Sequence, residues 1–219
     1  MTLYKNKYRI ETTRLKNWDY SSNGYYYITI CTKNREHIFG KIAVETGLKP
    51  VSTTKPVSKM IMTLNEYGKI VEKCWYDLSE HYANLKLDEF MIMPNHIHGI
   101  MIIDNNDIPA SAGIVETGLK PVSTKKPVST TISSTSIPST PAKTPNKKQH
   151  GLFELVRALK TFSSRRINEF RNSPGTPVWQ SRFHDRIVRD ENELNSIREY
   201  IKNNPINWET DDLNMEVAR

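Results

Sequence analysis

The chain has 219 residues, of which 37% are hydrophobic, and its mean hydropathy is −0.59. These values predict one compact core with polar segments outside it. A formal net charge of +7 favours an anionic partner such as nucleic acid. The sequence contains no apolar run of membrane-spanning length and no signal-peptide pattern, and two cysteines are too few for a disulfide framework. We therefore expect a cytoplasmic protein with reduced thiols and no membrane partner.

The first half of the chain contains a strand pattern and an unusual repeat. Aromatic and β-branched residues predict a strand over residues 25–32. A Pro- and Thr-rich peptide at 44–58 recurs at 115–129 with a single mismatch, and peptides of this composition bury too little apolar surface to fold. We expect one domain over 1–219, with an inserted repeat loop at 43–58 and a disordered inserted loop at 104–148.

Two histidines follow a turn in an apolar part of the chain. Apolar positions spaced by three and four predict a helix over 64–78, and residues 85–93 predict a strand that turns at Pro94-Asn95 into a second strand. Because side chains alternate along a strand, His96 and His98 point to the same face. Such a pair is half of a metal site, although the same spacing also suits two histidines satisfied by hydrogen bonds in a core.

Basic residues are concentrated between residues 150 and 189. Periodicity predicts a helix over 152–170 with one apolar and one basic face, and the segment 178–188 predicts a strand with interleaved aromatic and basic residues. Such a surface suits DNA, with phosphates bound by basic groups and unpaired bases by aromatic rings, although a solvated basic face is the alternative. The residues that we expect to contact DNA are Arg157, Lys160, Arg165, Arg166, Trp179, Arg182 and Arg186.

The last predicted helix carries a tyrosine and an asparagine one turn apart. Asp190 and Glu193 have the spacing of a capping box, which predicts a helix that continues to about Asn204. Tyr200 and Asn204 fall on one face of this helix, at the edge of its apolar stripe. Taken alone, the pair is more typical of a boundary aromatic and a helix-ending residue before Pro205 than of a functional site.

Together these segments resemble the HUH single-tyrosine transposases of insertion sequences, and most nearly the group associated with repetitive extragenic palindromes. The resemblance rests on His96-Ile97-His98 after Met93-Pro94-Asn95 and on Tyr200-Ile201-Lys202-Asn203-Asn204-Pro205, with further matches at 18–22, 87–90 and 177–180. It covers nearly everything except the repeat copies and the Ser/Thr-rich loop. It implies an α+β fold, a ferredoxin-like HUH nuclease core in which helices pack on one side of an antiparallel sheet.

The resemblance also implies an activity and a set of site residues. Tyr200 would attack a phosphate of single-stranded or hairpin-forming DNA, and it would form a 5′-phosphotyrosine and leave a free 3′-hydroxyl. His96, His98 and Asn204 would hold one divalent metal ion, Mg²⁺ or Mn²⁺, whose charge would assist the reaction. The resemblance leaves open whether the chain acts as a monomer or as a homodimer.

Two other functions are compatible with the same residues. The first is a protein that binds DNA hairpins but does not cut them. The second is a zinc hydrolase in which His96, His98 and His184 hold the ion.

Overall fold

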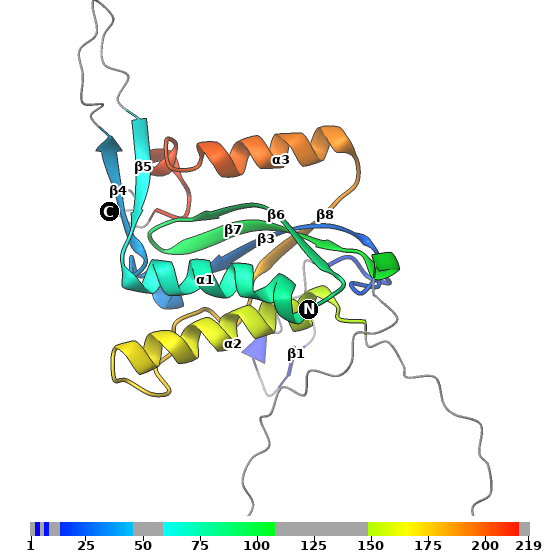
Figure 1. Ribbon diagram of the computed structural model, residues 1–219, viewed down its shortest axis with the longest axis horizontal. Helices are drawn as coiled ribbons and strands as arrows, with labels where there is room; N and C mark the ends of the chain where they lie inside the picture. The colour runs from blue at the N-terminus through cyan, green and yellow to red at the C-terminus, as the bar shows by residue number, and fades with distance from the viewer. Residues whose placement is uncertain (1–2, 5–6, 9–13, 46–58, 108–148, 215–219) are drawn as a thin grey trace, which may run out of the picture.

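A computed structural model describes a four-stranded antiparallel sheet in the order β6-β7-β3-β8 (Figure 1). The strands are β3 (Gly24–Cys31), β6 (Leu85–Ile92), β7 (His96–Ile103) and β8 (His184–Val188). The structure describes residues 3–4, 7–8, 14–45, 59–107 and 149–214. The predicted strand at 25–32 and the predicted hairpin through Pro94-Asn95 are therefore confirmed, and they form the middle of the sheet.

The sheet has an apolar core on each face because β7 is hydrophobic in both of its alternating sets of side chains. Ile97 and Met101 belong to the larger core, together with Ile28 of β3. Ile100 points the other way and belongs to a second, smaller core with Ile201. A strand that is buried on both faces reads as a continuous apolar run, which is what this part of the sequence shows.

Three helices pack on these two faces, and all are close to their predicted positions. The helices α1 (Glu66–His81) and α2 (Leu152–Phe170) pack against each other on the larger core, and α3 (Glu191–Asn203) covers the smaller one (Figure 1). The α+β class is confirmed. The expectation that the helices lie on one side of the sheet is wrong, because the second apolar set of β7 is covered by α3.

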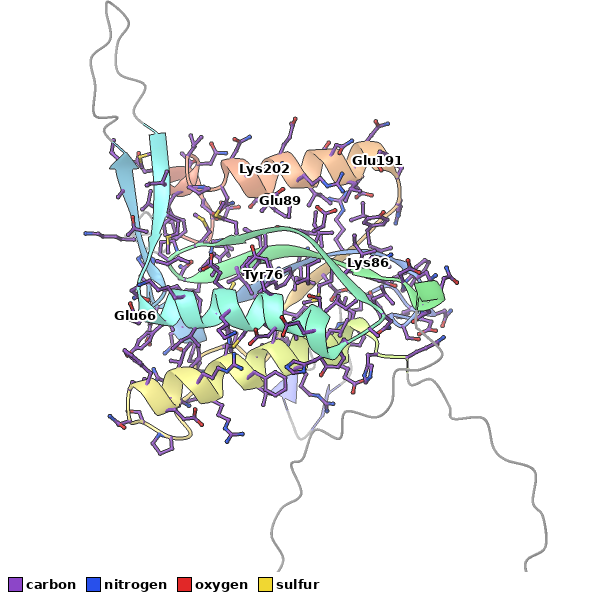
Figure 2. The ribbon with its side chains drawn as sticks, in the orientation of Figure 1. Glu66, Tyr76, Lys86, Glu89, Glu191 and Lys202 are labelled. Carbon is purple, nitrogen blue, oxygen red and sulfur yellow. The ribbon has the colours of Figure 1, made fainter. Side chains whose placement is uncertain are left out.

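The first turn of α3 and its ion pairs fix the position of this helix. Asp190 accepts a hydrogen bond from the amide of Glu193, which confirms it as the N-cap, but the Glu193 carboxylate accepts from the amide of Arg189 and not from that of Asp190, so the capping box is only half formed. On β6, a register shift between Leu87 and Phe90 lets two consecutive acidic residues reach α3. Their ion pairs are Asp88 with Arg198 and Glu89 with Lys202, and Figure 2 shows Glu89 and Lys202 on these facing elements.

A separate two-stranded ribbon was not predicted from the sequence. It consists of β4 (Gly40–Glu45) and β5 (Lys59–Leu64), which pair in an antiparallel register (Figure 1). The start of the predicted repeat loop at 43–58 therefore lies in β4, while residues 46–58 and most of the predicted loop at 104–148 lie outside the described residues. The remaining short elements are β1 (Leu3–Tyr4), β2 (Lys7–Tyr8), η1 (Lys33–Arg35), η2 (Asn105–Asp107) and η3 (Trp208–Thr210).

The predicted strand at 178–188 is strand only from His184 onward. Its first part is an irregular segment with one bridge, between Trp179 and Thr32, and the backbone of Gln180 donates to the carbonyl of Cys31. Trp179 is the reason for the difference, because its buried ring contacts Phe39 and its indole donates to Ser163 of α2. Within the described part of the chain, no helix has the length and apolar character that crossing a membrane requires.

Candidate metal and tyrosine site

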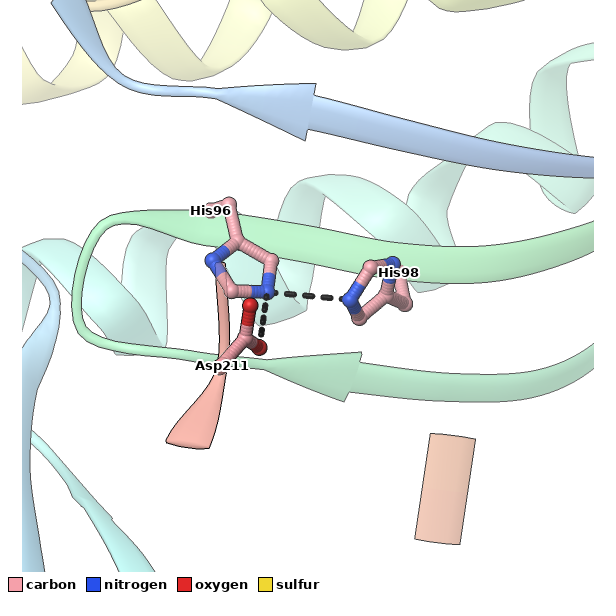
Figure 3. Close-up of side chains that lie close together, drawn as sticks. All are labelled: His96, His98 and Asp211. Atoms are coloured by element: carbon pink, nitrogen blue, oxygen red, sulfur yellow. Dashed lines mark hydrogen bonds and ion pairs between the residues drawn. The ribbon is translucent and has the colours of Figure 1, made fainter. Parts of the chain in front are cut away.

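The two histidines of β7 lie on the α3 face of the sheet with their rings turned toward each other. His96 and His98 are almost completely buried, and their Nε2 atoms are 3.0 Å apart (Figure 3). The prediction that they share a face is confirmed. What the sequence did not predict is how their other nitrogens are held.

Asn95 fixes the ring of His96. The asparagine amide nitrogen donates to the backbone carbonyls of Arg35 and Leu213, so its Oδ1 must be the atom that faces Nδ1 of His96 at 2.7 Å. An amide oxygen only accepts, and His96 therefore carries its proton on Nδ1. The lone pair of its Nε2 is left for another partner.

Two hydroxyl groups of β3 fix the ring of His98. Its Nδ1 lies 2.7 Å from the hydroxyl of Tyr27 and 2.9 Å from that of Thr29. Since a hydroxyl can donate or accept, His98 can hold its proton on either nitrogen. When the proton is on Nε2, this atom donates to Nε2 of His96. When the proton is on Nδ1, Nε2 of His98 has a free lone pair beside that of His96.

Burial keeps both rings neutral at physiological pH. It lowers the pKa of His96 well below its ordinary value, and the neighbouring His98 lowers it further. Burial also lowers the pKa of His98 to about 3, and the charge of His184 acts in the same direction. Neutral imidazole is the form that binds metal ions, so the site holds both rings ready to bind one.

Two further side chains, one that interacts with Tyr200 and one near His96, have a buried oxygen atom without a hydrogen-bond partner among the described residues. These atoms are Oδ1 of Asn204, from the end of α3, and Oδ2 of Asp211, from the turn that follows η3. Oδ2 of Asp211 is 3.9 Å from Nε2 of His96, and the ligand atoms of His96, His98 and Asp211 all lie within 4.8 Å of one another (Figure 3). A neutral His96 makes no ion pair with this carboxylate.

Tyr200 of α3 lies at the open edge of this group. Its ring is edge-on to the ring of His98, with centroids 5.3 Å apart, and it is 45% exposed. Burial raises the pKa of the hydroxyl above its ordinary value, and the charge of Asp211 raises it further, while interactions with Asn204 and Tyr27 oppose that rise. The predicted nucleophile therefore lies beside the predicted metal-binding histidines, but it needs help to lose its proton.

The residues present fit a metal ion. Two ligands about 2.1 Å from an octahedral ion and at right angles are roughly 3.0 Å apart, whereas tetrahedral zinc ligands are roughly 3.3 Å apart. The Nε2 separation of 3.0 Å is close to both values and is also a hydrogen-bond distance between the two rings, so it is compatible with an ion without selecting one. Among the described residues, the group close enough to share an ion contains Asp211 and not His184, so the zinc hydrolase with His184 is not favoured.

The predicted DNA-binding residues on α2 lie away from this site. They belong to the helix that packs on the other face of the sheet, and several are engaged locally. Lys160 donates to the carbonyls of Gln180 and Ser181, Arg165 pairs with Glu169, and Arg166 pairs with Asp77. The side chain of Arg157 is exposed.

The predicted DNA-binding residues of the following segment are divided between core and surface. Trp179 is only 6% exposed, so a base could stack on it only after a rearrangement. Arg182 is exposed. Arg186 is cross-strand neighbour to Tyr27 and pairs with Glu193 of α3, which places it on the same face as the histidines.

Comparisons with known proteins give one extensive relative. No family model matches the chain. An uncharacterized protein of Haemophilus influenzae is 32% identical over 202 residues, which are 91% of this chain and 90% of that protein. A solved structure, of "the REP associates tyrosine transposase bound to a REP hairpin", matches with a TM-score of 0.46 and 11% identity, covering 95% of this chain and 74% of that one. A crystal structure from Deinococcus radiodurans has a TM-score of 0.39 and 15% identity, covering 88% and 97%.

Proposed function

We propose that the chain is a DNA endonuclease and strand transferase that uses Tyr200 as its nucleophile. The chain and the Haemophilus influenzae protein belong to one family. One observation carries the proposal. The tyrosine that the resemblance singles out on α3 has its ring 5.3 Å from that of His98 on β7, although the two segments are far apart in the sequence, and Asn204 interacts with that tyrosine. A structural role alone does not require a half-exposed tyrosine above two buried imidazoles.

The reaction follows from these groups. The Oη atom of Tyr200 attacks the scissile phosphorus, the new bond joins tyrosine to the 5′ phosphate, and the bond from phosphorus to the 3′ oxygen breaks. The phenol releases its proton and the departing 3′ oxygen gains one, so a free 3′-hydroxyl results. Attack by a 3′-hydroxyl on the phosphotyrosine reverses these steps and rejoins DNA. The phosphoester is kept throughout, so no nucleotide cofactor is consumed.

The residues around Tyr200 have separate tasks in this scheme. Asn204 and Tyr27 oppose the rise in the tyrosine pKa, and they therefore stabilise the phenolate that attacks. His96, His98 and Asn204 would hold one Mg²⁺ or Mn²⁺ ion, which when bound supplies Lewis-acid polarisation of the scissile phosphate. Asn95, with Tyr27 and Thr29, orients the two rings for that role.

The DNA substrate that we propose is single-stranded or hairpin-forming. Arg186 and Arg182 would contact the strand near Tyr200, since Arg186 lies on the histidine face. The exposed guanidinium groups of α2, such as Arg157 and Arg165, would contact phosphates further from the cleavage point. The ion pairs of Arg166 and Arg186 would have to exchange with phosphate contacts.

A covalent-adduct assay tests this function. The full chain is incubated with Mn²⁺ and a pool of hairpin oligonucleotides with randomised single-stranded flanks, labelled at either the 3′ or the 5′ end. We expect the 3′ label, and not the 5′ label, to migrate with the protein in denaturing gels. Tyr200→Phe abolishes the adduct, whereas Tyr76→Phe, which changes another exposed tyrosine on α1, preserves it.

Three outcomes would contradict parts of the proposal. An adduct that persists in Tyr200→Phe removes this residue from the chemistry. A label transferred from the 5′ end means that the opposite bond is broken. Tight hairpin binding in a gel-shift assay without any adduct favours the non-cutting DNA-hairpin-binding protein instead.

A further inference from the structure

We infer that Asp211 is a ligand of the same metal ion, supplied by the segment that follows α3. The inference rests on the proposed function insofar as that function requires an ion between His96 and His98. It adds an anionic ligand that the sequence motifs do not contain. It also makes the segment 208–214 a part of the site.

The convergence of lone pairs carries the inference. The hydrogen bond to Asn95 leaves Nε2 of His96 without a proton, and Oδ2 of Asp211 faces it at 3.9 Å without any hydrogen-bond partner. The Asp211 side chain is only 8% exposed, so this oxygen has little contact with solvent. When His98 holds its proton on Nδ1, the lone pairs of both Nε2 atoms converge with this buried carboxylate oxygen, and a cation between them would remove their repulsion.

The Asp211 carboxylate is held in place by its own segment. Its Oδ1 accepts from the amide of Leu213 at 2.7 Å, and its backbone accepts from the amide of Asn214 and donates to Trp208. These bonds use one carboxylate oxygen and leave the other pointed at the histidines. Figure 3 shows the carboxylate beside the ring of His96.

The segment itself is fastened to the histidine turn. Asn95 donates to the carbonyl of Leu213 while it accepts from His96, so one amide orients both the ring and the segment that carries the carboxylate. Trp208 is buried, with its ring 6.0 Å from that of His96 and 5.4 Å from that of His37. The position of Asp211 beside the histidines is therefore fixed by contacts of its own segment with the rest of the fold.

The carboxylate also explains how the site would prefer a hard ion. Two neutral imidazoles and a neutral amide carry no negative charge, and imidazole ligands alone suit zinc, copper or nickel. A carboxylate oxygen is the ligand type that suits Mg²⁺ and Mn²⁺. We therefore expect the loss of Asp211 to weaken Mn²⁺ binding more than Zn²⁺ binding.

Metal titration of the full chain tests the inference without any DNA. Free Mn²⁺ is measured by electron paramagnetic resonance for the wild type, Asp211→Asn and Asp212→Asn, an exposed neighbour that serves as the matched control. We expect Asp211→Asn to raise the Mn²⁺ dissociation constant at least tenfold and Asp212→Asn to leave it unchanged. The dissociation constant for Zn²⁺, measured by competition, should rise less.

Thermal unfolding separates a ligand from a merely structural residue. Asparagine keeps the oxygen that accepts from Leu213, so the metal-free Asp211→Asn protein should unfold at the wild-type temperature or above it. The upward shift of that temperature by Mn²⁺ should shrink. Unchanged Mn²⁺ affinity in Asp211→Asn overturns the inference but leaves the proposed function standing. If Asp211→Asn binds Mn²⁺ more weakly but the wild type forms no DNA adduct, the inference stands and the proposed function is contradicted.

Discussion

Replacing Gly99 by alanine should destabilise the strand that holds His98, because this glycine lies directly under a buried ring. A Cβ atom at position 99 would be 2.4 Å from Cη2 of Trp75 and 2.9 Å from Cζ2. Ordinary carbon contacts are about 3.5–4.0 Å, so the ring or the strand would have to move by about 1 Å. The ring cannot move away freely, since Phe90 is stacked on Trp75 with centroids 4.3 Å apart.

The expected cost lies at the upper end of the range for overpacked cores. Inserting a methyl group into a well-packed core typically costs 1–3 kcal/mol, and Trp75 is fully buried with a neighbour behind it. We therefore expect Gly99→Ala to lower the free energy of unfolding by about 2–3 kcal/mol. Because His98 is the preceding residue of the same strand, movement of the strand should also weaken Mn²⁺ binding.

Urea unfolding followed by tryptophan fluorescence measures this effect. Gly24→Ala is the matched control, since its Cβ would meet Tyr26 at an ordinary 3.6 Å on a strand of the same sheet. The control should change stability by less than about 1 kcal/mol. If Gly99→Ala and Gly24→Ala unfold at the same urea concentration, the assumed rigidity of the Trp75–Phe90 stack is wrong.

Three further predictions concern the site. Without added metal, stability should fall as pH drops below about 6.5, by up to about 1.4 kcal/mol per pH unit for each ring, because His96 and His98 have lowered pKa values in the fold and take up protons on unfolding. Tyr27→Phe should weaken Mn²⁺ binding by about tenfold, since it removes a hydroxyl 2.7 Å from His98. Arg198→Met should destabilise the fold by about 2 kcal/mol and slow adduct formation, because it removes the ion pair of Asp88 and leaves this carboxylate with the amide of Glu89.

Each of these predictions has its own check. Urea midpoints at pH 7.5 and 5.5 compare the protonation states of the histidines, and equal midpoints would show that the rings are not buried as described. Calorimetric titration measures the Tyr27→Phe affinity, with Tyr76→Phe as control. For the ion pair, Arg165→Met is the control, because its partner Glu169 is as exposed as Arg165 itself, and it should cost less than about 0.5 kcal/mol.

The elements that the sequence predicts well are those whose local pattern agrees with their final environment. The period of α1 and the N-cap at Asp190 are local signals, and both are present in the structure. Alternation along β7 places His96 and His98 on one face without any knowledge of the fold. The helical spacing of Tyr200 and Asn204 works in the same way.

The features that the sequence does not predict depend on contacts between distant segments. Alternation puts the two histidines on a common face but does not say which helix covers it, and the smaller core around Ile100 decides that. Interleaved aromatic and basic residues suggest a DNA-binding strand near Trp179, yet the bond from its indole to Ser163 takes that ring into the core. Composition alone cannot separate a ring that stacks on a base from a ring that packs on a helix.

Asp211 is the clearest case of a residue whose role is set by its neighbours and not by its pattern. It stands in an acidic stretch after the last predicted helix, where a charged residue ordinarily faces solvent. The structure buries Asp211 because Trp208 packs near His96 and because Asn95 donates a hydrogen bond to the carbonyl of Leu213. The sequence contains one signal for this arrangement, because Asn95 precedes a histidine at a turn. A side-chain amide at that position can hydrogen-bond to an imidazole ring on one side and to a second chain segment on the other. The segment on that second side carries Asp211, and its carboxylate supplies the negative charge that two neutral imidazoles lack.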